Sequence, residues 1–188
     1  IQTLAYLLVE KMAGRLTQPA LIVAPLSVMG NWVSEIQRFA PDLRLLPYYS
    51  IKRSLASLEP IDVILSTYGV VSRDKKHLSS ITFSNLILDE AQWIKNARAK
   101  VTLVMQQLNA HCRLCLSGTP FENHLGELWS LFHFLMPGLL GTRRQFKTYY
   151  QDPIEKEGNT DRKAALMRRI QPFLMRRTKN QVALALPA

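Results

Sequence analysis

The sequence predicts an α/β protein with a parallel sheet flanked by helices and a C-terminal helical extension. Short runs rich in Val, Ile and Leu lack period-two polarity, which indicates strands buried on both faces. Stretches with apolar residues at helical spacing separate these runs, as in a doubly wound α/β layer. The alternation stops after Pro120, and only helical patterns follow it.

Four segments have the composition of buried strands. They are ALIVAP at 20–25, DVILST at 62–67, NLILDE at 85–90 and RLCLSGTP at 113–120. A weaker fifth candidate is RLLPYYS at 44–50. We expect these segments to form one parallel sheet, with right-handed crossovers between its strands.

Three stretches between the strands have apolar side chains at helical spacing. They are residues 1–13, 28–39 and 99–109. Each is expected to form a helix that covers one face of the sheet, because its apolar residues gather on a single side.

The residues after Pro120 are predicted to form helices alone. Pro137 and Gly138 would end a helix at residues 125–136, whose mostly core-facing apolar residues are Leu125, Leu128, Trp129, Leu131, Phe132 and Leu135. Thr142 and Gln145 fit a capping box for the next helix. The polar residues 151–159 are expected to form an exposed loop. Thr160 is then expected to cap a helix through Ile170, with a last helical piece in FLMRRTKNQVALAL.

The chain therefore divides near residue 121, into a sheet domain at 1–121 and a helical extension at 122–188. The formal net charge is +10, and residues 142–188 contribute +7 of it, from 11 basic and 4 acidic side chains. Such a tail suits a phosphate-rich partner, but a solvated helical face explains it equally well. No uninterrupted apolar run reaches the roughly 18 residues of a membrane span, so no membrane partner is expected.

The two cysteines cannot form a disulfide framework, which favours a reducing, intracellular setting. Cys112 and Cys115 have the Cys-x-x-Cys spacing of some metal sites. However, no second ligand pair lies at usable spacing, and a strand would direct the two thiols to opposite faces. The favoured interpretation is two small core residues.

Polar or turn-forming residues follow each of the four apolar runs. These residues are Pro25 and Ser27, Ser66 and Thr67, Asp89 and Glu90, and Ser117, Gly118 and Thr119. Ligands of open parallel sheets bind at the carboxyl ends of the strands. The pattern therefore predicts a site along one edge of the sheet.

The adjacent acids Asp89 and Glu90 have two interpretations. An unpaired buried carboxylate is costly, and a neighbouring like charge adds to the cost. A divalent cation removes this objection, since nucleotide hydrolases use an Asp at a strand end to hold Mg²⁺ and a nearby acid to orient water. The alternative is a helix cap, in which Asp89 precedes a helix that begins at Ala91 and Glu90 lies in its first turn.

The stretch SGTP after the fourth run would bring hydroxyl groups to the same edge. Gly118 permits a tight exit from the strand. Pro120 favours an extended Thr119. Ser117 and Thr119 would then lie near the acids, although an ordinary connection between a strand and a helix explains the stretch as well.

The order of these motifs resembles that of the Swi/Snf-type ATPases of helicase superfamily two. LIVAPLSVMGNWVSEIQRF is similar to the family's second motif and DVILSTYGVV to the next. LILDEAQWIKN resembles the Walker B segment, and LSGTPFENHLGELWSLFHFLMPGLLG the coupling motif with its helical continuation. FLMRRTKNQVALALP resembles the closing segment of the first lobe. The resemblance implies a RecA-like first lobe.

The resemblance also implies roles for single residues. Asp89 would bind Mg²⁺ through water, and Glu90 would activate or orient the hydrolytic water. The residues that would couple the nucleotide state to the DNA-binding surface are Gln92, Ser117, Gly118 and Thr119. The residues in motifs that flank the DNA path are Ser27, Asn31, Trp32, Thr67, Tyr68, Arg176 and Arg177. Trp32 also fits a helix core, and the two arginines also fit a solvated surface.

Gln92 departs from the family pattern, in which many members have His after Asp-Glu-Ala. Glutamine can form hydrogen bonds but does not titrate near neutral pH. A coupling role is therefore compatible with Gln92, whereas a role that needs a proton is not.

The resemblance implies further parts that these 188 residues do not contain. IQTLAYLL is similar to the segment directly after the Gly-Lys-Thr phosphate loop, so that loop is expected upstream of Ile1, and a second RecA-like lobe beyond Ala188. The intact protein would use ATP and Mg²⁺ to move along double-stranded DNA without separating its strands. The fragment alone is expected to be inactive.

Two other functions stay open at this stage. One is a non-catalytic binding module that uses the basic extension, and the other is an RNA-directed member of the superfamily. The expected location is intracellular, either the bacterial cytoplasm and nucleoid or the nucleus.

Overall fold

The structure is a computed structural model that describes residues 1–51, 54–55, 60–118 and 124–175. The chain forms two compact units, Ile1–Leu140 and Gly141–Ala188. No helix in these described ranges is long and apolar enough to cross a bilayer.

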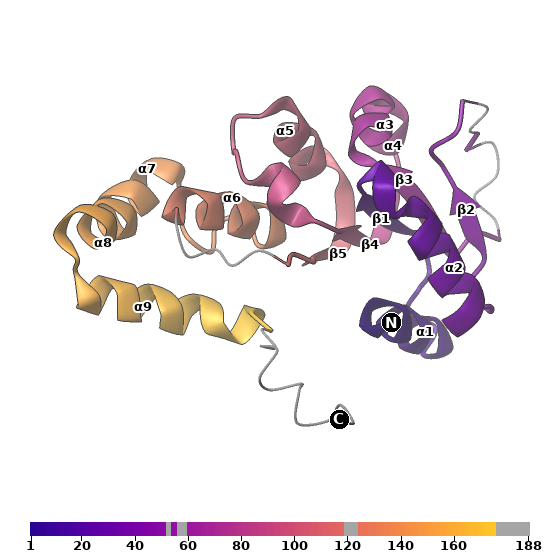
Figure 1. Cartoon of the computed structure of the whole chain (residues 1–188), viewed down its shortest axis with the longest axis horizontal. Coiled ribbons are helices and arrows are strands. Elements are labelled where there is room, and N and C mark those ends of the chain that lie inside the picture. Colours follow the sequence, from indigo (N-terminus) through magenta and orange to yellow (C-terminus); the bar gives the residue numbers. More distant parts are fainter. Residues whose placement is uncertain (52–53, 56–59, 119–123, 176–188) are drawn as a thin grey trace. The chain divides into compact units, whose positions relative to one another are not determined.

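A parallel five-stranded sheet forms the centre of the first unit (Figure 1). The strands, in spatial order, are β2 (Leu45–Pro47), β3 (Val63–Thr67), β1 (Ala20–Ala24), β4 (Thr82–Leu88) and β5 (Asn109–Cys115). Every neighbouring pair is parallel. The predicted parallel sheet is confirmed, including the weaker candidate that became β2.

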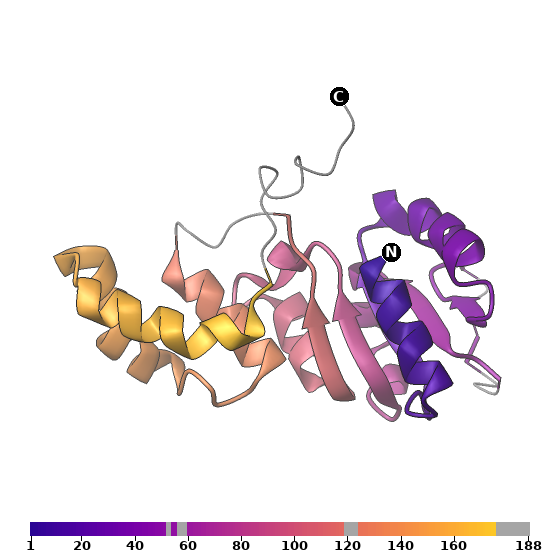
Figure 2. The ribbon, with the colours of Figure 1, turned by 90° about the horizontal axis from the view of Figure 1, so that it is seen from below.

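Helices cover both faces of this sheet, as Figure 1 and Figure 2 show. One face carries α1 (Gln2–Met12) and α2 (Met29–Phe39). The other carries α3 (Tyr68–Arg73), α4 (Lys75–Leu78) and α5 (Lys100–Gln107). The helices predicted at 1–13, 28–39 and 99–109 correspond to α1, α2 and α5.

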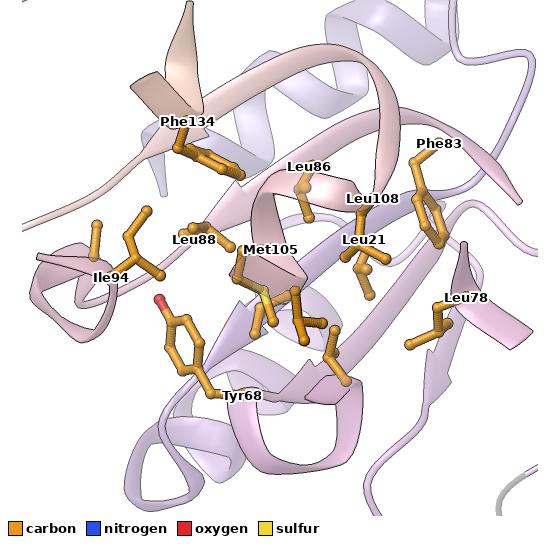
Figure 3. Packing of buried hydrophobic residues seen from close by; sticks show 14 of the residues in the cluster. Leu21, Tyr68, Leu78, Phe83, Leu86, Leu88, Ile94, Met105, Leu108 and Phe134 are labelled. Atoms are coloured by element: carbon orange, nitrogen blue, oxygen red, sulfur yellow. The ribbon is translucent and has the colours of Figure 1, made fainter. Parts of the chain in front are cut away.

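The strand residues alternate between two hydrophobic clusters, which explains why both faces had to be apolar. Leu21 and Val23 belong to the cluster on the side of α3, α4 and α5, part of which Figure 3 shows. Ile22 and Ala24 belong to the cluster under α1 and α2. All of β1 is buried, as expected for a central parallel strand.

The outer strand β5 is less buried than the central strands. Cys115 packs against the cluster on the α5 side, but Cys112 is exposed. The prediction that both cysteines are core residues is therefore wrong for Cys112. The error has a simple cause: an outer strand leaves part of its surface to solvent, and the apolar run alone does not identify the edge.

Helix α6 (Leu125–Leu135) packs with the first unit, where it contacts β5, α5 and the 3₁₀ helix η2 (Ala91–Ile94). Six of its residues are buried, in keeping with its apolar sequence. Because of these contacts, α6 belongs to the same compact unit as the sheet. The assignment of residues 122–188 to a family-specific extension stays a prediction.

The second unit is helical over its described part. It contains α7 (Arg143–Phe146), the π-helical segment η3 (Lys147–Gln151), α8 (Asp152–Glu157), α9 (Thr160–Ile170) and the 3₁₀ helix η4 (Gln171–Phe173). The capping box of Thr142 and Gln145 at the start of α7 is confirmed. The last predicted helical piece lies mostly outside the described residues, as do Arg176 and Arg177.

Two local predictions in this unit are wrong. Residues 151–159 were predicted as an exposed loop, but α8 occupies 152–157. Pro153 lies in its first turn, where proline is tolerated, and Gly158 ends it in a left-handed conformation. The cap of α9 is Asn159, not Thr160, because the Asn159 side chain accepts the backbone N–H of Arg162. The polar composition of residues 151–159 led to the loop prediction, although Pro153 and Gly158 are typical helix-end residues and Asn159 is a typical helix cap.

A buried carboxylate ties α1 to the β2–β3 edge of the sheet. Asp62, just before β3, accepts hydrogen bonds from Lys11 Nζ at 2.8 Å and from Arg44 Nε at 2.9 Å. It also accepts the backbone N–H of Arg44. Burial by itself raises the pKa of Asp62, but the bonds from Arg44 and Lys11 outweigh it and hold that pKa well below its usual range.

Asp62→Asn is expected to lower the free energy of unfolding by about 2 kcal/mol at pH 7, since it removes charge-assisted hydrogen bonds. The stabilisation is complete above the unfolded pKa near 3.8 and is lost as pH falls toward the lower folded pKa. The difference between wild type and variant should therefore shrink below about pH 4. Urea unfolding at pH values from 7 to 3 measures this difference in the free energy of unfolding. Asp42→Asn, at an exposed position, is the control. A difference that is constant with pH would contradict this account.

Candidate functional site at the carboxyl edge of the sheet

The ends of β4 and β5 meet at one edge of the sheet. Leu88 pairs with Cys115 in the parallel register. Beyond the paired strands, Leu116 N–H donates to the Leu88 carbonyl at 2.8 Å, and Ala91 N–H donates to the Leu116 carbonyl at 2.9 Å. The residues that follow Leu88 and those that follow Leu116 therefore share one rim, as the sequence predicted.

Asp89 is held at this rim by groups from three other segments. Its backbone N–H donates to the carbonyl of Val23 in β1 at 2.8 Å. The Trp32 indole Nε1–H of α2 donates to Oδ2 at 2.8 Å. The Tyr68 hydroxyl of α3 donates to the Asp89 carbonyl at 2.7 Å. The acid is thus fixed at its backbone and at its side chain.

Tyr68 remains a neutral phenol in this arrangement. Burial raises the pKa of Tyr68 far above its usual value, and the nearby carboxylates of Asp89 and Glu90 raise it further. Figure 3 shows its ring within the core, with the hydroxyl on the side of Ile94 and Leu88. The hydroxyl therefore keeps its proton and remains a donor to Asp89.

Glu90 has an unusual backbone conformation. Its φ of 49° makes it the only non-glycine residue with positive φ among the described residues. This conformation is uncommon for a residue with a side chain and is often retained where function requires it. The backbone N–H of Glu90 donates to Asp89 Oδ1 at 2.9 Å. In this conformation the Glu90 backbone is thus a hydrogen-bond partner of the Asp89 carboxylate.

The helix-cap interpretation of the two acids is wrong. The segment after Glu90 is the short 3₁₀ helix η2, and no side chain forms a cap hydrogen bond at its start. Asp89 instead uses its carboxylate toward Trp32 and the Glu90 backbone.

Gln92 connects Glu90 to the segment after β5. Its Nε2 donates to Glu90 Oε2 at 2.7 Å, and the Ser117 hydroxyl donates to its Oε1 at 3.4 Å. The predicted coupling residues Gln92 and Ser117 thus contact each other, and Gln92 also contacts the acid. Thr119 lies outside the described residues. Gly118 is exposed, its φ is not positive, and no described atom lies within 4 Å of a Cβ added there. The structure therefore shows no steric need for glycine at the end of β5.

The five described residues predicted to flank DNA fall into three groups. Ser27 and Asn31 are exposed near the start of α2. Thr67 accepts the backbone N–H of Val70 and caps α3. Trp32 and Tyr68, in contrast, point toward Asp89. The two motifs that contain these residues therefore contribute side chains both to the contacts of Asp89 and to the protein surface.

Sequence reasoning did not predict the contacts around η2. Trp93 is half-exposed and stacks on Tyr68, with 5.3 Å between ring centroids and 8° between ring planes. Ser130 of α6 donates to the Ile94 carbonyl at 2.6 Å. The apolar continuation after SGTP was the available signal, since its helix α6 holds η2 in place.

The donor set at Asp89 suits a magnesium ion. Mg²⁺ prefers carboxylate oxygens, keeps several waters and needs only one or two carboxylates together with substrate phosphates. Each Asp89 oxygen accepts one hydrogen bond in the structure, and a carboxylate oxygen can accept more than one. Within the described ranges no cluster of three or more His, Cys, Asp or Glu side chains could hold a metal. Asp89 could contribute one such carboxylate.

Comparison with known proteins identifies the family. The model of the SNF2-related domain matches residues 1–188.

The chain belongs to the SNF2-related domain family.

Two relatives illustrate the range of this SNF2-related family. YwqA of Bacillus subtilis, named as a candidate ATP-dependent helicase/translocase, is 45% identical over 100% of this chain and 21% of the relative. The TATA-binding protein-associated factor BTAF1 of Arabidopsis thaliana is 40% identical over 90% of this chain and 9% of the relative. The chain thus spans about a fifth or less of the length of these relatives.

Solved structures confirm the RecA-like fold. The Sulfolobus solfataricus SWI2/SNF2 ATPase core in complex with dsDNA matches with a TM-score of 0.88 and 40% identity, over 97% of this chain and 38% of that chain. A Sulfolobus solfataricus SWI2/SNF2 ATPase core domain matches with a TM-score of 0.86 and 39% identity, over 99% of this chain and 38% of that chain. The family resemblance of the motifs is confirmed.

Tyr68→Phe is expected to lower the free energy of unfolding by about 1 kcal/mol, because the Asp89 carbonyl loses its hydrogen bond in a partly buried setting. Urea unfolding measures this change. Tyr49→Phe is the matched control, since the Tyr49 hydroxyl has no hydrogen-bond partner among the described residues. Equal effects of the two variants would show that the Tyr68 bond contributes nothing.

Proposed function

We propose that this chain is part of the first lobe of a DNA-dependent ATPase that moves along double-stranded DNA. The observation that carries the proposal is the shared rim, where Asp89, Glu90, Gln92 and Ser117 lie within one hydrogen-bonded group. The relative YwqA, named as a candidate ATP-dependent helicase/translocase, supports this proposal.

Asp89 and Glu90 have separate roles in the proposed reaction. Asp89 would hold Mg²⁺ through water, and the bound ion would neutralise charge on the phosphates during hydrolysis. Glu90 would accept a hydrogen bond from the attacking water and orient it. Gln92 Nε2 also donates a hydrogen bond to the Glu90 carboxylate and restrains it. The Gln92 amide would not take the proton of the attacking water, because an amide does not titrate near neutral pH.

Gln92 and Ser117 would transmit the state of the nucleotide. Ser117 follows β5, and Gln92 lies in η2 after β4. A change at Glu90 would reach Ser117 through one side chain, over bonds of 2.7 Å and 3.4 Å. Thr119 belongs to the same proposed coupling motif and lies outside the described residues.

The proposed DNA path runs along exposed residues of the second and third motifs. Ser27 and Asn31 are exposed and offer polar groups suited to phosphate oxygens. The net charge of +10 favours such a polyanion. Binding would be mainly to the backbone, weakly dependent on sequence and sensitive to salt. The Sulfolobus structure with dsDNA supports this choice of partner.

The topology is compatible with a phosphate-binding loop in longer proteins of this kind. The connection from β1 to β2 passes through α2, which lies on the same face as α1. Parallel crossovers are right-handed, and α1 covers the same face as α2, so a strand that led into α1 would lie on the side of β1 opposite to β2. On that side β4 and β5 already occupy the nearest positions, so this strand would lie beyond β5. Its carboxyl end, and the loop after it, would then adjoin Ser117. A second RecA-like lobe would close the site, in an intracellular protein.

Glu90→Gln in the full-length protein is expected to lower DNA-stimulated ATP hydrolysis by at least about 100-fold, the usual contribution of a positioned general base. Phosphate release with and without duplex DNA measures the rate. Glu157→Gln, at an exposed position of α8, is the matched control and should keep wild-type activity. Activity in wild type that Glu90→Gln leaves intact would contradict the role of Glu90. Stimulation by duplex RNA but not DNA would contradict the partner.

Gln92→His should introduce a pH dependence that wild type lacks. The new imidazole would lie next to Glu90 and titrate near pH 6.5, so its protonated form would pair with the carboxylate and weaken it as a base. The activity of the variant relative to wild type should fall as pH is lowered from about 8 to about 5.5. Gln107→His, exposed on α5, is the control. A ratio that stays constant would argue against contact between residue 92 and Glu90.

A further inference from the structure

The indole of Trp32 makes a contact that its position in the sequence did not predict. Trp32 lies on α2, four residues before the buried Ile36, and its ring packs against the cluster under α1 and α2. Its Nε1–H nevertheless reaches across to Asp89 Oδ2 at 2.8 Å. The two residues are 57 positions apart in the chain.

This contact restrains the side chain that faces the proposed metal. An indole has a single donor and no acceptor, so the bond to Oδ2 uses its whole hydrogen-bonding capacity. The other oxygen, Oδ1, accepts the backbone N–H of Glu90 at 2.9 Å. With both oxygens held and the backbone bonded to Val23 and Tyr68, the carboxylate of Asp89 has one favoured orientation.

We propose that Trp32 is a positioning residue for the metal-binding carboxylate: its indole N–H fixes Asp89 in the orientation that receives Mg²⁺. This inference rests on the proposed function of Asp89. Groups that hydrogen-bond to a metal ligand orient it, and their loss commonly lowers metal affinity or activity by 10–100-fold. Trp32 acts through Asp89 and need not touch the ion or the nucleotide.

A simpler explanation is that Asp89 only satisfies a partly buried indole, since Trp N–H groups usually find a partner. The two explanations differ in what they predict. If the bond serves the indole, its loss changes stability and leaves the Mg²⁺ requirement unchanged. If the bond serves the carboxylate, its loss raises the Mg²⁺ concentration that the enzyme needs.

The first test uses ATP hydrolysis by the full-length protein as Mg²⁺ is varied. Trp32→Phe keeps an aromatic ring but removes the N–H donor, and it should raise the Mg²⁺ concentration for half-maximal activity by about 10-fold. Trp93→Phe makes the same chemical change at a half-exposed ring and should stay within about twofold of wild type. An unchanged Mg²⁺ midpoint in Trp32→Phe would overturn the proposal. Should that variant fail to fold, Trp32→Leu repeats the test with an apolar side chain that also lacks a donor.

The second test does not depend on activity. The three tryptophans of the 188-residue chain give three indole ¹H–¹⁵N signals, and Trp32→Phe identifies one of them by its loss. Asp89→Ala should shift that signal and speed its hydrogen exchange, while those of Trp93 and Trp129 stay. A Trp32 signal that Asp89→Ala leaves in place would overturn the proposal. An inactive wild-type enzyme with a responsive Trp32 signal would instead contradict the proposed ATPase function.

Discussion

The candidate site depends on two backbone hydrogen bonds that join the segments after β4 and β5. Leu116 N–H donates to the Leu88 carbonyl, and Ala91 N–H donates to the Leu116 carbonyl. These bonds extend the parallel pairing past the regular strands and force Glu90 and Ser117 to the same rim. Without them, the acids and the hydroxyl would be unrelated features of two loops, and neither Gln92 nor the left-handed turn would have a role.

The rim also explains how two like charges can be adjacent at the end of a buried strand. Glu90 has a left-handed backbone conformation, and the two carboxylates accept hydrogen bonds from different partners. Asp89 is bound by Trp32 and by the Glu90 N–H, and Glu90 is bound by Gln92. Each partner is a neutral donor, so neither carboxylate is neutralised by these bonds, and both charges would be available to the proposed cation and water. The Asp62 group, a structural anchor with full charges, lies instead at the β2–β3 edge of the sheet.

The sequence was sufficient for the sheet and for the rim, because both follow from strong local rules. Buried parallel strands are apolar on both faces, and their carboxyl ends lie at one edge of the sheet. The sequence therefore predicted that Asp89 and Ser117 lie at the same edge. The directions of side chains could not be predicted. Trp32 was consistent with a DNA contact or a core position, and only tertiary structure brings its N–H to Asp89. The failures at Cys112 and α8 have the same origin, since edge position and tertiary context decide them.

The most direct test is a structure of the full-length protein with Mn²⁺ and a non-hydrolysable ATP analogue, in which the metal is located by its anomalous scattering. The metal is expected one water molecule away from the Asp89 carboxylate, with the terminal phosphate beside Glu90 and Gln92. A metal and nucleotide bound away from the ends of β4 and β5 would contradict the account.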